Sequence, residues 1–262
     1  MKRKKWIYPL LVVLTAIVLY FIEEQTDQKE EKWQPILSDF DYFPTSTTGQ
    51  IVKHATYALS YSEPHEQAEW VAYELAREQL VNTTWKRPLF QIDKKVKTGA
   101  AHWNNYKNSG YSKGHLLPAA DRKFTKADYY STFLTSNIAP QLPDFNAGVW
   151  NRLEQKVRYW AGKNRHLYVI TGGVLNGDLK TIGSEEVAVP NYFYKVLLDN
   201  TEPEIKAIAF LVPHKESAAA LYSFTVSIDS IESLTGIDFF PALPDDLEDK
   251  LEADSDYKKW SF

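Results

Sequence analysis

One apolar stripe at helical spacing lies within residues 146–160 and predicts the clearest helix of the chain. The stripe consists of Trp150, Leu153, Val157 and Trp160. Gly162 follows the last apolar residue of the stripe and is expected to end the helix. Shorter helices are expected over residues 126–133 and from Asp229 onward.

Other segments carry the alternation or the apolar runs that are typical of strands. These segments are residues 54–61, 167–171, 191–198 and 206–212. Residues 69–80 are ambiguous, because Val71 and Leu75 belong to an alternating pattern whereas the Ala, Glu, Leu and Arg content favours a helix. Since strands are grouped with a few helices and βαβ alternation is missing, the pattern predicts an α+β fold.

An uncharged run over residues 6–22 follows four basic residues at positions 2–5. As a helix this run would span about 25 Å, close to the ~30 Å hydrocarbon core of a bilayer. We interpret it as an uncleaved transmembrane signal-anchor, with residues 1–5 in the cytoplasm and the catalytic domain periplasmic or extracellular. A cleaved signal peptide is the alternative, although residues 18–23 lack the small side chains that a signal peptidase requires. Residues 23–50 are then interpreted as a tether, and residues 51–262 as the globular domain.

The composition supports a sizeable core, because 44% of the 262 residues are hydrophobic and 14% are aromatic. The absence of cysteine excludes disulfides, zinc–thiolate sites and thiol nucleophiles. The net charge of -4 argues against a nucleic-acid binder, but the charge is unevenly distributed. Residues 86–126 contain ten basic and two acidic residues, a net charge of +8. We interpret this stretch as a phosphate-facing surface, with a solvated face as the alternative. The candidate substrate-binding residues in it are Lys86, Lys113, Arg122 and Lys123.

His115 is the leading candidate for a catalytic base. Its unperturbed pKa near 6.5 suits general-base catalysis at neutral pH, and the preceding Gly114 permits close approach of a ligand. A lone histidine is more often structural, and the remaining five histidines are assigned that role. They are His54, His65, His102, His166 and His214.

Asn146 and Glu154 offer oxygen ligands for a hard cation. An amide oxygen together with a carboxylate that holds water suits Mg²⁺, and ideal helix geometry separates the two side chains by about 80°. The alternatives are an N-cap for Asn146 and a surface ion pair between Glu154 and Arg158. Asn137 is either a turn residue or an amide that orients His115 or a phosphate oxygen.

Three ordered motifs resemble the DNA/RNA non-specific endonuclease family, which includes endonuclease G and bacterial sugar-non-specific nucleases. The matching residues are Ser112-Lys-Gly-His115 with Leu117-Pro-Ala119, then Ser136-Asn-Ile-Ala-Pro-Gln141, then Asn146 with Trp150, Leu153 and Glu154. Weaker similarity extends from residues 70–75 to residues 235–241. The resemblance implies a ββα-metal active site within a mixed or antiparallel sheet flanked by helices.

The resemblance also implies the roles of the site residues. His115 would activate water, and Asn146 would be the only direct protein ligand of one Mg²⁺, with Mn²⁺ as the alternative ion. Glu154 would hold the metal through water, and Asn137 would position groups around His115. The metal would stabilise the developing charge and the leaving 3′ oxygen, which leaves 5′-phosphate ends.

The chain departs from the family pattern next to the histidine, because Ser112-Lys113 replaces the family's Asp-Arg. Lysine keeps the charge but lacks the bidentate fork that arginine offers a phosphate. A second family arginine falls near Lys86 or Arg87, so Lys113 and Arg87 join the expected catalytic set.

The first interpretation is therefore a Mg²⁺-dependent, sequence-tolerant endonuclease for DNA and RNA at the membrane. The alternative is a catalytically silent nuclease-fold module that binds nucleic acid there, and a third is a hydrolase for another phosphodiester. The sequence leaves open a homodimer and an inhibitor protein as further partners.

Overall fold

The computed structural model describes residues 12–18, 35–37, 40–201 and 203–262. The chain divides into two compact units, Met1–Gln34 and Pro35–Phe262. In the first unit, residues 12–18 are helical and exposed. Within the described residues, no helix is long and apolar enough to cross a membrane. The predicted signal-anchor over residues 6–22 lies mostly outside the described residues and stays a prediction.

The second unit is built on a seven-stranded sheet in the order β1-β2-β3-β6-β9-β10-β11, in which every neighbouring pair is antiparallel. The strands are β1 (Ile51–Lys53), β2 (Ala58–Ser62), β3 (Gln67–Ala76), β6 (His166–Gly173), β9 (Tyr192–Asp199), β10 (Lys206–Pro213) and β11 (Thr225–Val226). Two small antiparallel pairs stand apart from it. They are β4 (Ser112–His115) with β5 (Ile138–Gln141), and β7 (Lys180–Ile182) with β8 (Val187–Val189).

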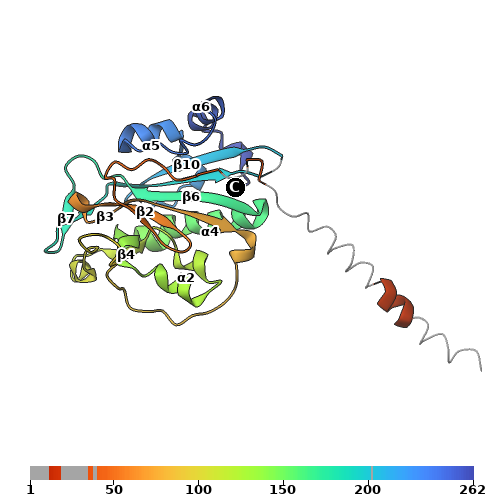
Figure 1. Cartoon of the computed structure of the whole chain (residues 1–262), viewed down its shortest axis with the longest axis horizontal. Coiled ribbons are helices and arrows are strands. Elements are labelled where there is room, and N and C mark those ends of the chain that lie inside the picture. Colours follow the sequence, from red (N-terminus) through yellow and green to blue (C-terminus); the bar gives the residue numbers. More distant parts are fainter. Residues whose placement is uncertain (1–11, 19–34, 38–39, 202) are drawn as a thin grey trace, which may run out of the picture. The chain divides into compact units, whose positions relative to one another are not determined.

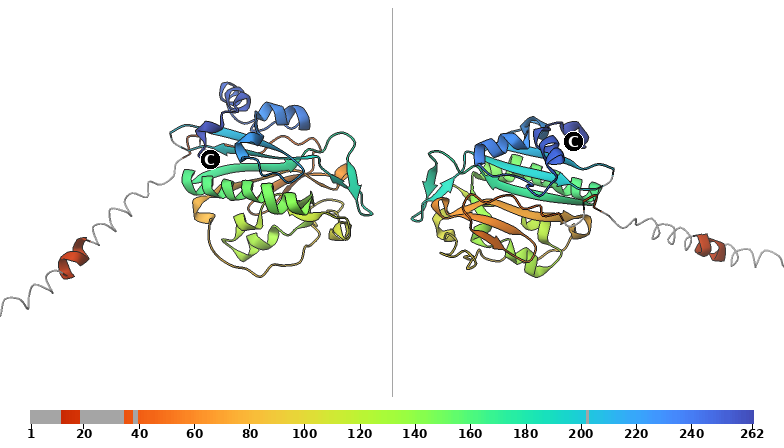
Figure 2. Two further views of the ribbon diagram at one scale, coloured as in Figure 1. Left: turned by 180° about the vertical axis from the view of Figure 1, so that it is seen from behind. Right: turned by 45° about the horizontal axis from the view of Figure 1, so that its top comes forward.

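Helices cover both faces of the large sheet. On one face lies α4, in the same layer as β4 and α2, and on the other face lie α5 and α6 (Figure 1). Figure 2 shows the same layers from behind and with the top of the molecule tilted forward. The helices are α2 (Lys126–Ser131), α3 (Pro143–Phe145), α4 (Asn151–Asn164), α5 (Ile228–Thr235) and α6 (Asp245–Ala253). Short 3-10 helices occupy Glu63–His65, Arg77–Gln79, Trp103–Tyr106, Ala119–Arg122, Thr135–Asn137, Leu221–Phe224 and Tyr257–Lys259.

Alternate residues of the central strands point into two separate cores, because successive side chains of a strand face opposite sides of a sheet. In β6, Leu167 and Val169 join the core beneath α4, whereas Tyr168 and Ile170 join the core beneath α5 and α6. The predicted stripe of α4 is buried in the first of these cores. The mixed α+β fold with an antiparallel sheet, expected from the sequence, is confirmed.

One ambiguity is settled and two local expectations need correction. Residues 69–76 form the greater part of strand β3, because a strand buried on both faces gains more from packing than its helix-forming residues lose, and residues 77–79 form a 3-10 helix. The long helix does not end at Gly162 but continues to Asn164, where Arg165 takes a positive φ of 72°. Residues 35–37 and 40–50 were assigned to the tether. They pack on the folded unit instead, partly through an antiparallel bridge from Pro35 to Thr201.

Candidate active site

The β4–β5 hairpin and the helical segment after it place His115 and Asn146 in one ββα unit. His115 ends β4 and pairs with Ile138 of β5. The neighbouring Gly114 lies against the side chain of Gln141, and a Cβ at position 114 would collide with that amide. Glycine is therefore required beside the histidine by close packing and not by an unusual backbone angle.

The imidazole of His115 packs between two aromatic rings. Its centroid lies 5.5 Å from that of Phe90 and 4.9 Å from that of Phe133, the latter edge-on. Within the described residues, the buried Nε2 atom has no hydrogen-bond partner. Burial, and next the nearby charge of Arg87, lowers the pKa of His115 to about 4. The ring is therefore neutral at pH 7 and can accept a proton.

Two cations surround the same aromatic cluster. The guanidinium of Arg87 lies 5.7 Å from the ring centre of Phe90 and 5.4 Å from that of Phe133. The ammonium of Lys113 lies 5.7 Å from the ring of Phe90 and 5.8 Å from that of Tyr106. Lys113 and Arg87, which the sequence placed in the catalytic set, therefore flank the phenyl ring that contacts His115. Positive charge around a neutral base suits an anionic substrate.

Asn146 is not the N-cap that the sequence offered as an alternative; it is the C-cap residue of α3. It begins a π-helical turn, Asn146–Trp150, that joins α3 to α4 and contains non-helical dihedral angles at Gly148. Its side-chain amide makes no hydrogen bond within the described part of the chain, so it is available to a ligand. Because the chain is kinked at Gly148, the offset of about 80° in an ideal helix does not apply between Asn146 and Glu154.

The kink in this turn is filled by a carboxylate that the sequence did not identify. Glu216 accepts a hydrogen bond of 3.0 Å from the backbone N–H of Val149, which lies directly after the kink. A Cβ at Gly148 would collide with this carboxylate. Glu216 thus satisfies a backbone donor that the break in the helix would otherwise leave unpaired.

Glu154 is half-buried and is not paired with Arg158, so the alternative interpretation of Glu154, a surface ion pair, does not hold. Arg158 donates instead to the buried Asp121, at 2.8 Å. Burial raises the pKa of Glu154, and the charge of Asp121 raises it further, while Lys195 and Arg158 oppose the rise. A carboxylate in this state gains stabilisation from any added positive charge.

Lys195 of β9 is a second residue that the sequence analysis missed. Its side chain is fully buried, its Nζ lacks a hydrogen-bond partner within the described residues, and it lies 4.9 Å from the ring centre of Trp150. Burial lowers the pKa of Lys195, and the attraction of Glu154 opposes that change. A lysine inside an otherwise apolar strand was the available signal, and only the sheet register shows that it faces α4.

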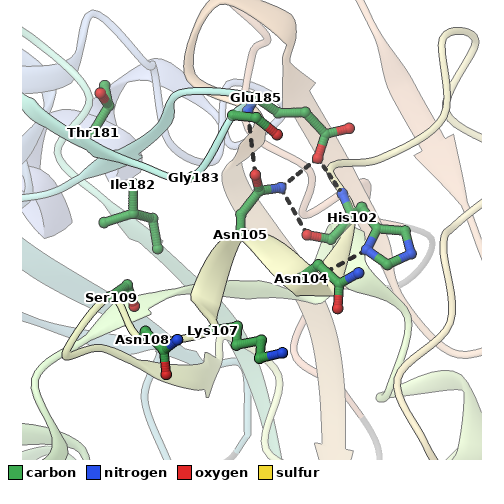
Figure 3. A pocket seen from close by; sticks show the side chains of 11 residues that line it. His102, Asn104, Asn105, Lys107, Asn108, Ser109, Thr181, Ile182, Gly183 and Glu185 are labelled. Carbon is green, nitrogen blue, oxygen red and sulfur yellow. Dashed lines mark hydrogen bonds between the residues drawn. The ribbon is translucent and has the colours of Figure 1, made fainter.

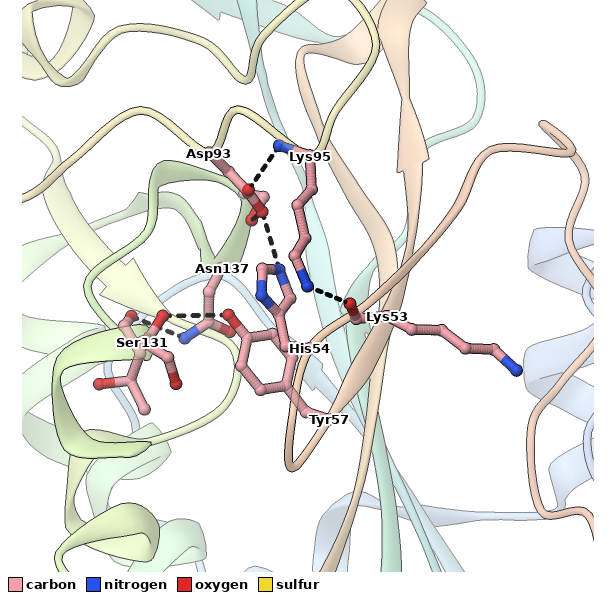
Figure 4. A network of polar contacts seen from close by, with 9 residues as sticks. Lys53, His54, Tyr57, Asp93, Lys95, Ser131 and Asn137 are labelled. Atoms are coloured by element: carbon pink, nitrogen blue, oxygen red, sulfur yellow. Dashed lines mark hydrogen bonds and ion pairs between the residues drawn. The ribbon is translucent and has the colours of Figure 1, made fainter. Parts of the chain in front are cut away.

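The side chain of Asn137 forms its hydrogen bonds with the backbone and not with the imidazole. Its Oδ1 accepts from the N–H of Leu117 at 2.9 Å, and its Nδ2 donates to the carbonyls of Leu117 and Thr132 at 3.0 and 2.9 Å. Figure 4 shows this amide beside Tyr57 and Ser131. With both ends of the amide engaged, Asn137 cannot orient a phosphate oxygen. It fixes the backbone that immediately follows His115.

Arg122 was predicted to bind substrate, and this prediction is wrong. Its side chain is 0% exposed and donates to the carbonyls of Asp121, Thr56 and Glu74 at 2.9, 3.0 and 2.9 Å. An arginine whose donors bind buried carbonyls supports the fold. Lys86 is exposed and Lys123 is half-exposed, so both remain candidates for phosphate contact.

The basic stretch over residues 86–126 presents more positive charge than its net +8 suggests. Both of its acids are buried, and Asp121 pairs with Arg158. Asp93 bonds to His54 at 2.9 Å (Figure 4) and accepts a hydrogen bond from the hydroxyl of Ser136 at 2.6 Å. Without Arg122 nine basic residues remain, and no side chain of these nine forms an ion pair with an acid of this stretch.

A cavity of about 650 Å³ lies between the loop at residues 102–109 and the β7–β8 pair (Figure 3). Asn105 braces it by donating to Glu185 and to the carbonyl of His102. Lys107 belongs to its lining, whereas His115 and Asn146 do not. The cavity therefore adjoins the basic stretch without containing the candidate base or metal ligand.

The residues at the site fit a bound divalent ion. Asn146 offers an amide oxygen without an intramolecular partner, and Glu154 is a carboxylate whose pKa burial has raised. Within the described residues, neither side chain takes part in an ion pair. Oxygen donors of this kind suit a hard cation such as Mg²⁺ or Mn²⁺.

Comparisons with known proteins define the class as nuclease. Mitochondrial nuclease EXOG of Danio rerio is 32% identical over 271 residues, covering 95% of this chain and 78% of that protein. Human mitochondrial endonuclease G is 32% identical over 207 residues, covering 73% of this chain and 70% of that protein. A crystal structure of the EndoG/EndoGI complex matches with a TM-score of 0.70 and 26% identity, covering 74% of this chain and 87% of that one.

The family described as DNA/RNA non-specific endonuclease matches residues 40–246. The chain belongs to this family, and it is a nuclease of the hydrolase class. Members of the family are metal-dependent. The family resemblance read from the three motifs is thereby confirmed.

Proposed function

We propose that this nuclease is a Mg²⁺-dependent endonuclease that hydrolyses DNA and RNA without sequence preference. The observation that carries the proposal is the state of His115. It is a neutral imidazole with a buried, unpartnered Nε2, held beside the cations Arg87 and Lys113. Such a base is ready to take a proton from water next to an anionic phosphodiester.

The hydrolytic step assigns a role to each of these residues. Nε2 of His115 accepts a proton from water as the water oxygen forms a bond to phosphorus. The bond from phosphorus to the 3′ oxygen breaks, which leaves a 5′ phosphate. Arg87 and Lys113 hold the phosphodiester and offset its charge while that charge grows. Asn137 is a positioning residue, because it fixes the backbone at Leu117, two residues beyond the base.

Asn146 would hold the metal ion directly, and Glu154 would hold it through water. When bound, Mg²⁺ supplies Lewis-acid stabilisation of the developing charge and of the leaving oxygen. Lys195, buried behind Trp150, favours the ionised form of Glu154 and thus keeps that carboxylate able to bind water. Mn²⁺ is the alternative ion, because it also accepts oxygen ligands.

Sequence tolerance follows from what the site offers a substrate. The cations Arg87 and Lys113, with Lys86 and Lys123 nearby in the sequence, are suited to phosphates, and phosphate contacts carry no base information. The lysine at position 113 gives a point charge where the family has an arginine fork. A lower rate than in arginine-containing relatives is therefore part of the proposal.

The test is cleavage of supercoiled plasmid and of RNA by the full-length chain in mild detergent, with Mg²⁺, Mn²⁺ or EDTA. His115→Ala is compared with the wild type, and His65→Gln serves as a histidine control in the β2–β3 connection. We expect metal-dependent nicking that falls by about 10²–10⁴ in His115→Ala and persists in His65→Gln.

Intact nucleic acid in every metal and at every pH would refute the proposed endonuclease. If the protein then still bound DNA in a metal-dependent manner, the silent nucleic-acid-binding module would replace it. Lys113→Arg would next show whether the departure at this position had removed activity. Cleavage of small phosphodiesters alone would indicate the third interpretation, a hydrolase for another diester.

We also propose the membrane anchor, on the strength of the uncharged run at residues 6–22 behind four basic residues. Mass spectrometry of the mature N-terminus and fractionation of cells test it, and loss of the first twenty or so residues would overturn it. An inhibitor protein and a homodimer belong to the same set of proposals. The structural relative in the EndoG/EndoGI complex supports only the first of these two partners.

A further inference from the structure

Five carboxylates meet between α5 and α6, on the sheet face away from the candidate active site (Figure 1). They form two groups of three that share Glu252. Within each group, one oxygen from every member lies within 4.8 Å of the others. The first group is Asp229, Glu232 and Glu252, and the second is Asp238, Glu248 and Glu252.

Glu252 is the member that sets this cluster apart from a solvated acidic surface. Its side chain is 8% exposed, and its buried Oε1 has no hydrogen-bond partner within the described residues. The buried Oε1 of Glu248 is also unpartnered there. None of the five carboxylates forms an ion pair with a lysine, arginine or histidine among the described residues. Leaving a buried carboxylate oxygen unsatisfied is energetically unfavourable, so a missing partner is expected.

Oxygens that all lie within 4.8 Å of one another are close enough to share one calcium ion. Calcium binds six to eight oxygens at about 2.3–2.6 Å, so two ligands on opposite sides of the ion are about 4.8 Å apart. A carboxylate-rich, irregular site suits calcium better than magnesium, which demands octahedral geometry and keeps several waters. We propose that Glu252, with Asp229, Glu232, Asp238 and Glu248, binds a divalent cation of the calcium type.

Electrostatics supports the geometry. Burial, followed by the charges of Glu232 and Glu248, raises the pKa of Glu252 to about 8. The cluster must therefore take up either a proton or a cation at neutral pH. A proton shared between Glu232 and Glu252 is the competing occupant. In that case calcium would not raise the Tm.

The cation would stabilise the fold, because the cluster joins the elements that cover the core beneath α5 and α6. Glu232 already accepts a hydrogen bond of 2.7 Å from the N–H of Phe239, a fully buried residue of the connection between α5 and α6. Ile231 of α5 and Leu251 of α6 are buried in the same core. A cation would fasten α5, α6 and their connection to one another.

The test measures thermal unfolding of the full-length chain in EDTA, Ca²⁺ and Mg²⁺. All variants carry Asn146→Ala, so that the candidate catalytic ion does not contribute. In this background Glu252→Gln and Asp238→Asn, the latter at an exposed position, are compared with Asp246→Asn. Asp246 is exposed on α6, the helix that also carries Glu252, and it lies outside both groups.

We expect Ca²⁺ at about one hundred times its Kd to raise the Tm by about 5–10 °C in the background and in Asp246→Asn. The shift should vanish in Glu252→Gln and shrink in Asp238→Asn. An equal shift in all four proteins, or none in any, would overturn the cation site. A Tm that ignores calcium but falls as the pH rises through 8 would assign the shared proton instead.

Discussion

Replacing Arg122 with methionine tests whether this arginine supports the fold or binds substrate. Methionine keeps much of the apolar stem but removes three hydrogen bonds, to the carbonyls of Asp121, Thr56 and Glu74. Each bond from a charged donor contributes about 1.5–3 kcal/mol, and removal of the buried charge recovers part of the loss. The expected decrease in the free energy of unfolding is therefore about 3–5 kcal/mol.

The decrease is measured by denaturant unfolding at pH 7 and by the Tm, which should fall by about 10 °C. Lys123→Gln is the control, because Lys123 is half-exposed and makes no ion pair among the described residues. It should change stability by less than about 0.5 kcal/mol and lower the salt dependence of DNA binding by about one unit of slope. The reasoning fails if Arg122→Met unfolds like the wild type and only Arg122→Met weakens DNA binding.

Three further predictions rest on other residues. Because burial lowers the pKa of His115 to about 4, cleavage should decline on the acid side near pH 4, and an inflection of kcat/KM near pH 6.5 would contradict this. Asp93 is buried, but bonds from His54 and Ser136 outweigh burial and lower its pKa. Its stabilising effect is therefore present above the unfolded pKa of about 3.9 and lost as the pH falls through the folded value. Asp93→Asn should cost about 1–3 kcal/mol at pH 7 and much less at pH 3, and equal costs by denaturant unfolding at both pH values would refute it. Gly148→Ala should displace Glu216, destabilise by about 1–3 kcal/mol and lower kcat. Adding Glu216→Ala should then cost little more, and full additivity in a double-mutant cycle would argue against their contact.

Local pattern and spacing determined much of the fold and part of the site. The apolar stripe from Trp150 to Trp160 predicted the helix that becomes α4, and the alternating and apolar runs predicted strands β2, β6, β9 and β10. The motifs around His115 and Asn146 identified the family, because each of them spans only a short stretch of the sequence. These features depend on residues that are near one another in the sequence.

The state of each charged or polar side chain was decided only by the tertiary structure. Arg122 and Lys123 are adjacent and look alike in the sequence, yet the first is fully buried and the second is half-exposed. Lys195 faces α4 only because β9 has its particular register in the sheet. The side-chain amide of Asn137 is hydrogen-bonded to backbone groups that lie up to twenty residues away in the sequence. Solvation depends on which distant segments pack above a side chain. A sequence can therefore identify the charged residues around a site, but the packing of the whole sheet decides which of them are accessible to the substrate.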